Sequence, residues 1–190
     1  MVTLLPIEGE AFYGCIGELI INSKTFVEKD YTFHNCPQKD SYGWLNGNKF
    51  TQLIIGNSIT KIGDYTFFGC SSLTSVIIPD SVTSIGEGAF SGCESLTSVT
   101  IPDSVTSIES GAFSGCNSLT SVTIPDSVTS IAEGAFYECS SLKTIICKAS
   151  TPPVLEKDAF YKIPVDATII IPEGCEDAYM NSDWKYLFEE

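Results

Sequence analysis

The sequence has a single histidine, His34, and its cysteines never form a C-x-x-C pair. One histidine excludes an H-E-x-x-H metal site and most catalytic triads, and zinc lacks its usual ligand spacing. The only Cys/His pair close in sequence is His34 with Cys36, and nothing else in the pattern favours it as a nucleophile. G-x-G-x-x-G, P-loop and G-x-S-x-G motifs are also missing. We therefore expect no catalytic residue, no cofactor and no metal ion.

Basic residues are scarce as well. There are 10 lysines and arginines against 24 aspartates and glutamates, and the net charge is -14. This balance argues against nucleic acid and anionic membrane as partners. No apolar run approaches the length of about 18 residues that a membrane span needs, so we expect no membrane insertion. The opening "MVTLLPIEGEAF" lacks the basic start and long apolar stretch of a signal peptide, and we expect a mature form or a fragment.

What the chain does have is a repeat. "IPDSVTSIGEGAFSGCESLTSVT" begins at Ile78 and returns with few changes at Ile101 and at Ile124. Residues 77–99 and 100–122 agree at 19 of 23 positions. Apolar positions persist while polar ones drift, which marks the persistent ones as packing positions. In one copy these are Leu73, Val76, Ile78, Ile85, Phe90 and Cys93.

The repeat divides one predicted domain, residues 1–190, into three parts. Residues 1–52 form irregular N-terminal coils with an insertion at about 37–48, which is rich in turn formers. Residues 53–145 hold the regular 23-residue repeats. Residues 146–190 hold a degenerate last repeat and a C-terminal cap, in which we expect a helix. This helix would set Trp184, Leu187 and Phe188 against the last coil.

One unit predicts a short strand, a turn and a corner. In "LTSVTIP", Val99 and Ile101 alternate with polar residues, which is typical of a strand with one buried side. Pro102 ends this strand, and residues 111–116 are expected to form a tight helical or 3₁₀ corner. A unit this short cannot bury its own apolar side, but copies stacked about 4.8 Å apart can. The sequence therefore predicts a β-rich parallel solenoid.

The motif "IPDSVTSIGEGAFSGCESLTSV" resembles the BspA-like leucine-rich repeats, and the ending from Cys147 resembles the last unit and cap of that family. The resemblance covers about residues 8–188. It implies a right-handed leucine-rich-repeat solenoid of about six to seven coils. Proteins of this family are secreted or lie on the surface of gut and mouth bacteria, and are also abundant in some parasitic protists. An extracellular or cell-surface location and a role in adhesion are thus what the resemblance implies.

Cysteines recur in register with the repeat, as Cys70, Cys93, Cys116 and Cys139. We expect a column of buried thiols that pack as small apolar groups beside the phenylalanines. Disulfides between neighbouring coils are an alternative, although parallel side-chain directions oppose the required torsion. A zinc site is a weaker alternative. The sequence does not decide how Cys15, Cys36, Cys147 and Cys175 are paired.

A second column follows each proline, with Asp80, Asp103 and Asp126, and with Asn57 in the equivalent place one coil earlier. An aspartate at such a position usually accepts a hydrogen bond from its own turn, which is the interpretation we favour. A stacked column of carboxylates could instead hold Ca²⁺, but the chain lacks the EF-hand and the Asp-rich nonapeptide.

The outward side of the predicted strands is the candidate binding face. Small polar and β-branched side chains there keep an exposed sheet soluble, which is a sufficient reason for them. Stacked repeats also create an extended surface that solenoids use for binding. The residues of this face are Ser75, Ile77, Ser98, Thr100, Ser121, Thr123, Thr144 and Ile146. Tyr42 and Trp44 of the insertion are further candidates, because aromatic side chains on loops are common hot spots.

These patterns favour a non-enzymatic protein-binding module of the adhesin type, which we expect to be a monomer. Its predicted partner is a host matrix protein or a bacterial surface protein. A structural spacer within a larger surface protein is one alternative. A glycan-binding module is another, and it would require exposed aromatic side chains clustered over a polar groove.

Overall fold

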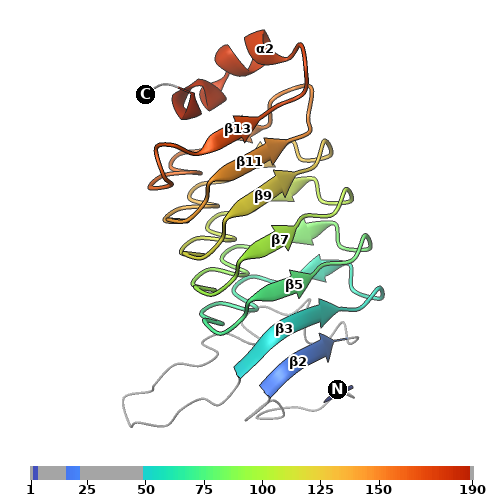
Figure 1. The fold of residues 1–190 in the computed structure, drawn as a ribbon. Coiled ribbons are helices and arrows are strands. Elements are labelled where there is room, and N and C mark those ends of the chain that lie inside the picture. The colour runs from blue at the N-terminus through green and yellow to red at the C-terminus, as the bar shows by residue number, and fades with distance from the viewer. Residues whose placement is uncertain (1, 4–15, 22–48, 189–190) are drawn as a thin grey trace.

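The computed structural model describes residues 2–3, 16–21 and 49–188, and these form a stack of coils with α2 at its C-terminal end (Figure 1). Two parallel sheets run along the stack. The long sheet is eight-stranded, in the order β1 (Val2–Thr3), β2 (Ile16–Ile21), β3 (Lys49–Ile55), β5 (Ser75–Ile77), β7 (Ser98–Thr100), β9 (Ser121–Ile124), β11 (Thr144–Cys147) and β13 (Thr168–Ile170). The short sheet is five-stranded, in the order β12 (Val154–Leu155), β10 (Ser130–Ile131), β8 (Ser107–Ile108), β6 (Ser84–Ile85) and β4 (Lys61–Ile62). The predicted parallel solenoid is confirmed.

The repeat period sets the register of the long sheet. Val76 lies beside Val99, and Val99 lies beside Val122, so equivalent residues of successive coils are direct neighbours. Side chains alternate along each strand, and in β7 the valine is buried while Ser98 and Thr100 are exposed. Stacking removes the apolar side chains from water, which stabilises the fold by roughly 25 cal/mol per Å² buried. Strands this short persist because each coil supplies the core of its neighbours.

A column of phenylalanine rings fills the corner side of the core. The five rings are those of Phe67, Phe90, Phe113, Phe136 and Phe160. Successive ring centroids lie 5.2, 5.4, 5.4 and 5.0 Å apart, and no two neighbouring planes differ by more than 13°. These separations are close to the strand spacing of about 4.8 Å, so rings and strands stack together without strain.

The corners differ from the sequence prediction. Phe90 donates its N–H to the carbonyl of Ala112 in the next coil at 2.8 Å, so the corner itself joins coil to coil. On either side of it, Gly88 and Gly92 have φ values of 55° and 71°, in the left-handed region that glycine adopts without cost. A helix cannot continue through left-handed residues. The corner is therefore a series of three overlapping turns, closed by Ala89, Ser91 and Cys93, and the helical or 3₁₀ corner expected from the sequence was wrong.

A C-terminal cap covers the last coil. It consists of α2 (Glu176–Met180) and the 3₁₀ helix η1 (Asp183–Leu187) (Figure 1). Trp184 is fully buried, and its ring lies 5.8 Å from that of Phe160, the last ring of the column. Its indole N–H donates to the carbonyl of Pro153 at 2.8 Å. The tryptophan thus ends the aromatic column and satisfies a backbone group of the last coil.

The rest of the cap agrees with the prediction in part. Leu187 is half-buried against the core, as expected. Phe188 was predicted to pack there too, but it is 36% exposed, so this part of the prediction was wrong. Tyr179 is buried in addition to Trp184, and its hydroxyl donates to the carbonyl of Ala149 at 2.7 Å. A turn at residues 181–182 separates α2 from η1, whereas one helix was expected.

We predict that Trp184→Ala lowers the free energy of unfolding by about 3–5 kcal/mol, because it opens a cavity and leaves the Pro153 carbonyl unsatisfied. Deletion of residues 175–190 should go further and cause aggregation or loss of cooperative unfolding. Urea denaturation, monitored by circular dichroism, measures the free energy of unfolding and its cooperativity for both variants.

Tyr186→Ala is the matched control, since Tyr186 lies on the same 3₁₀ helix but is exposed. It should change the free energy by no more than about 0.5 kcal/mol. A monomeric deletion variant with an unchanged melting curve would refute the capping role.

Candidate binding surfaces

The long sheet brings the predicted binding residues together in two columns. In the first column Ser75 pairs with Ser98, Ser98 with Ser121, and Ser121 with Thr144. In the second, Thr100 pairs with Thr123 and Thr123 with Ile146, while Ile77 lies at the corresponding end of β5. All eight side chains are exposed or half-buried. We call these two columns the strand face.

The strand face is longer than the sequence predicted. Gln52 on β3 pairs with Ser75, and Thr168 on β13 pairs with Thr144, so the first column continues at both ends. The second column gains Ile54 and Ile170 by the same register. Sequence reasoning missed these residues because the flanking coils have diverged from the repeat. Counting 23 residues back from Ser75 leads to Gln52, so this signal was present.

Threonines next to the strand face have a structural role. Thr74 donates its hydroxyl to the carbonyl of Thr51 at 2.8 Å, and Thr97 donates to that of Thr74 at 3.1 Å. Thr120 repeats the bond to Thr97 at 3.3 Å. These hydroxyls already hold one coil to the coil before it. They border the strand face and are not counted among its residues.

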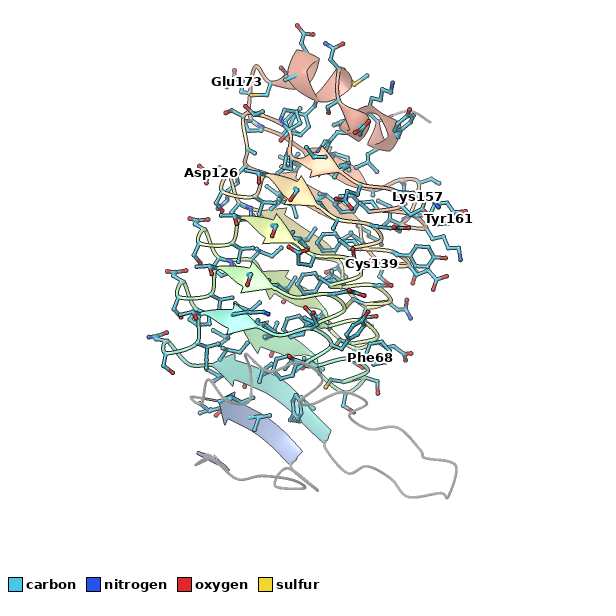
Figure 2. The ribbon with its side chains drawn as sticks, turned by 180° about the vertical axis from the view of Figure 1, so that it is seen from behind. Phe68, Asp126, Cys139, Lys157, Tyr161 and Glu173 are labelled. Atoms are coloured by element: carbon cyan, nitrogen blue, oxygen red, sulfur yellow. The ribbon has the colours of Figure 1, made fainter. Side chains whose placement is uncertain are left out.

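The aspartate column does not behave as predicted. Asp80, Asp103 and Asp126 are exposed, and none accepts a hydrogen bond from its own turn. The turn is held by its backbone and by the following serine instead. Ser104, for example, donates its hydroxyl to the carbonyl of Val82 in the previous coil at 2.5 Å. The prediction that each aspartate accepts a hydrogen bond from its own turn was therefore wrong. The carboxylates lie along the edge on which Figure 2 shows Asp126 and Glu173.

The cysteines of the column are buried and are free thiols. Cys70, Cys93, Cys116 and Cys139 carry no disulfide. The thiol of Cys116 donates to the carbonyl of Phe90, 3.4 Å away in the preceding coil, and Cys139 makes the same contact with Phe113 at 3.2 Å. Each thiol therefore lies under the aromatic column and satisfies a backbone carbonyl there. This agrees with the interpretation as small buried groups and not with disulfides between coils.

Burial also lowers the reactivity of these thiols. It raises the pKa of Cys139 to about 12, and it raises the pKa of Cys116 as well, with the neighbouring thiols Cys93 and Cys139 adding to the effect. A thiolate is the reactive form of cysteine, so the column is poorly suited to nucleophilic chemistry. Among the residues that the structure describes, no three His, Cys, Asp or Glu side chains are placed to hold a metal ion.

The family model of the BspA type leucine rich repeat region matches residues 40–165 in 6 copies. The chain belongs to this family. A leucine rich cell surface protein from Faecalibacterium prausnitzii is 34% identical to the chain, and its structure superposes with a TM-score of 0.58. That similarity covers 79% of this chain and 40% of the other, so the chain spans less than half the length of that relative.

Two further solved structures share weaker similarity. A leucine-rich repeat protein from Bacteroides ovatus is 26% identical, with a TM-score of 0.38, over 70% of this chain and 48% of the other. The T. pallidum leucine rich repeat protein is 20% identical, with a TM-score of 0.46, over 72% and 86%. No curated protein matches the chain. Across the described part of the chain, we find no helix with the length and apolar character of a membrane span.

In this BspA-type repeat protein, one group of exposed and half-buried residues escaped the sequence analysis. The rings of Tyr137 and Tyr161 stack 5.7 Å apart at the last two corners. Lys162 lies over both rings, 5.2 and 5.9 Å from their centroids, and pairs with Glu138 at 2.5 Å. The hydrogen bond to Glu138 raises the pKa of Lys162 above its usual value. We call these four residues the corner cluster.

The corner cluster departs from the repeat in two ways. Ser-Gly at residues 91–92 and 114–115 becomes Tyr-Glu at 137–138 and Tyr-Lys at 161–162. Glu138 and Lys162 take the left-handed conformation that glycine has in the earlier coils, with φ values of 58° and 61°. Such a conformation is strained for a residue with a side chain. Figure 2 shows Tyr161 and Lys157 on the edge opposite Asp126. The insertion with Tyr42 and Trp44, together with Cys15, His34 and Cys36, lies outside the described residues.

We predict that the column cysteines react with a thiol reagent at least about a hundredfold more slowly in the native protein than in urea, because a thiol of pKa about 12 is ionised to roughly 1 part in 10,000 at pH 8. Mass mapping after pulsed alkylation measures this. Cys175, which is half-buried in the cap, is the internal control and should be labelled in the native protein. Disulfides joining Cys70 to Cys93 or Cys116 to Cys139 would contradict the prediction.

Proposed function

We propose that the protein is a non-enzymatic, protein-binding module of the adhesin type, displayed at the cell surface, and that the strand face is its contact surface. This proposal is based on the register of the long sheet, because the register aligns short, uncharged side chains of successive coils into one continuous surface. The description of the Faecalibacterium relative as a cell surface protein supports the location.

The strand face suits a protein more than a small molecule. Its serines and threonines are short, so a flat or extended polypeptide can approach the backbone closely across several coils. No aromatic residue stands in the two columns from Ser75 to Ile146, whereas a glycan module would need aromatic side chains to stack on sugar rings. Serine and threonine are poor hot-spot residues, so we expect modest affinity from this face.

Charge favours a basic partner. No lysine or arginine occurs between Lys61 and Lys143, while Asp80, Asp103 and Asp126 line one edge of the same coils. This acidic edge borders a neutral strand face, and it would steer a positively charged protein toward it. Binding should therefore weaken as salt is raised, since exposed charges are screened.

We predict that replacing Ser98, Thr100, Ser121 and Thr123 together by Lys weakens binding by about tenfold or more, because four long charged side chains keep a partner away from the sheet. The probe is an array of purified extracellular matrix proteins and bacterial surface proteins, followed by surface plasmon resonance on any that bind. The melting temperature should stay within about 3 °C, since these side chains are not part of the core.

The matched control carries four lysines on exposed turns away from the strand face, at Glu94, Asn117, Glu133 and Ser140. It should bind nearly as the native protein does. If binding survives the strand-face lysines but is lost when Tyr42 and Trp44 become Ala, the insertion is the contact site. If no protein on the array binds more tightly than about 100 μM, the spacer alternative replaces the proposal.

A further inference from the structure

The cap leaves part of the last coil open. A pocket of about 640 Å³ lies between η1, the last corner and β13. The apolar residues that line it include Leu155, Phe160, Ile163, Ile169 and Leu187. Four of these, all but Phe160, are only half-buried, although the equivalents of Leu155, Ile163 and Ile169 in the previous coil are fully buried. The pocket is thus a piece of the core surface that the cap does not reach.

The rim of the pocket carries exposed side chains suited to binding. Val165 is fully exposed and Tyr186 is 67% exposed, and both line the pocket. Tyr161 and Lys162 of the corner cluster line it too. Tyrosines at the edge of an apolar pocket are frequent hot spots, because they bury a large area at little cost in conformational entropy.

The strand edge beside this pocket is also open. Thr168 donates its N–H to the carbonyl of Lys143 at 2.7 Å, so its backbone groups are directed toward β11. Successive residues of a parallel strand direct their backbone groups to opposite sides of the strand. Ile169 therefore directs its N–H and C=O away from β11. β13 is the last strand of the long sheet, and no group in the described part of the chain bonds to these two atoms of Ile169.

Apart from its short length and the neighbouring cap, β13 lacks the features that normally protect an edge strand. Its three residues, Thr168–Ile170, include no charge and no proline, and Ile170 is exposed. Natural proteins usually place a lysine, a proline or a bulge on an unpaired edge, because such an edge accepts another strand. This unpaired edge beside an apolar pocket therefore offers the same two contacts that each earlier coil offers to its successor, strand pairing and apolar burial.

We propose that an extended peptide segment of a partner protein adds to β13 as a further strand of the long sheet. An apolar side chain of this segment, in register with Ile169, enters the pocket between the last corner and η1, and its neighbours point outward beside Ile170. The main-chain bonds supply affinity and the pocket selects the apolar residue. This end site is separate from the strand face, and it goes beyond the function proposed above.

The geometry favours a peptide over a second copy of the chain. The pocket volume is within the range of about 300–1,000 Å³ found for small ligand sites, so it accommodates a few side chains and not a whole coil. A second copy related by a two-fold axis would bring its own α2 and η1 to the same place, and a copy stacked head to tail would bring a whole coil. An extended segment has no such bulk.

The probe is a fluorescent synthetic peptide with the protein's own strand sequence, "SLTSVTIP", from Ser118 to Pro125. This sequence occurs in two coils, at residues 95–102 and 118–125, and in each its strand pairs with the coil before it, so it should fit the open edge as well. We expect saturable binding by fluorescence polarisation. A peptide with Val122 replaced by Asp, and one N-methylated at Val122 and Thr123, should each bind about tenfold more weakly or not at all.

The protein variants test the pocket. Val165→Glu with Tyr186→Glu places two charges on the rim and should weaken peptide binding by about tenfold or more. The matched control is Val154→Glu with Met180→Glu, which changes two exposed residues near the same end that do not line the pocket. It should bind within about twofold of the native protein. The strand-face lysine variant should also keep full peptide binding, which separates this site from the function proposed above.

Hydrogen exchange measured by NMR gives a second readout that does not depend on any substitution. The amide of Ile169 should exchange freely in the native protein and gain protection of about tenfold or more when the peptide is bound. Absence of saturable binding, equal weakening by both double variants, or an Ile169 amide that the peptide leaves unprotected would each overturn the proposal. A concentration-dependent dimer that the two rim charges dissociate would overturn it in favour of a second copy.

Discussion

The structure depends on placing each phenylalanine ring over its equivalent in the next coil. Rings that stack 5.0 to 5.4 Å apart require every coil to rise by nearly the same distance, and parallel strands require about 4.8 Å. A unit of fixed length satisfies both, which accounts for the 23-residue period in the regular coils. The cysteine thiols under the rings and the threonine hydroxyls beside the long sheet then bond between coils without further adjustment. The strand face follows from the same alignment, because residues in register on the core side are also in register on the outer side.

Periodicity made the fold and the strand face predictable. Ser98 and Thr100 were assigned to the outer side because Val99 had to face the core, and the exposure of both residues beside a buried Val99 confirms that arrangement. The same reasoning failed where conformation, and not burial, decides the outcome. A short segment with an alanine and a phenylalanine is compatible with a helical turn, and only the left-handed Gly88 and Gly92 exclude it. A pattern of apolar and polar residues contains no information about the sign of φ.

The C-terminal end was harder to predict because it occurs once. Recurrence at one position of the repeat indicates that a residue has a packing role. Tyr179 and Trp184 do not belong to the repeat, so this signal is missing for them. The pocket beside η1 could not be predicted either, since it depends on how far the cap extends over the last coil. Exceptions to the repeat are still informative. The change from Ser-Gly to Tyr-Glu and Tyr-Lys at residues 137–138 and 161–162 places side chains in left-handed positions, and it occurs next to the open end of the sheet.

Hydrogen bonds across the regular coils join each coil only to the coils directly before and after it. Thr97 bonds to Thr74 and is bonded by Thr120, and the same pattern recurs at each corner. An internal coil could therefore be lost or duplicated as a whole unit of 23 residues, and the two newly adjacent surfaces would be as complementary as the old ones. The reach of such a protein can thus change during evolution in steps of about 4.8 Å, without a new solution to the packing of its core.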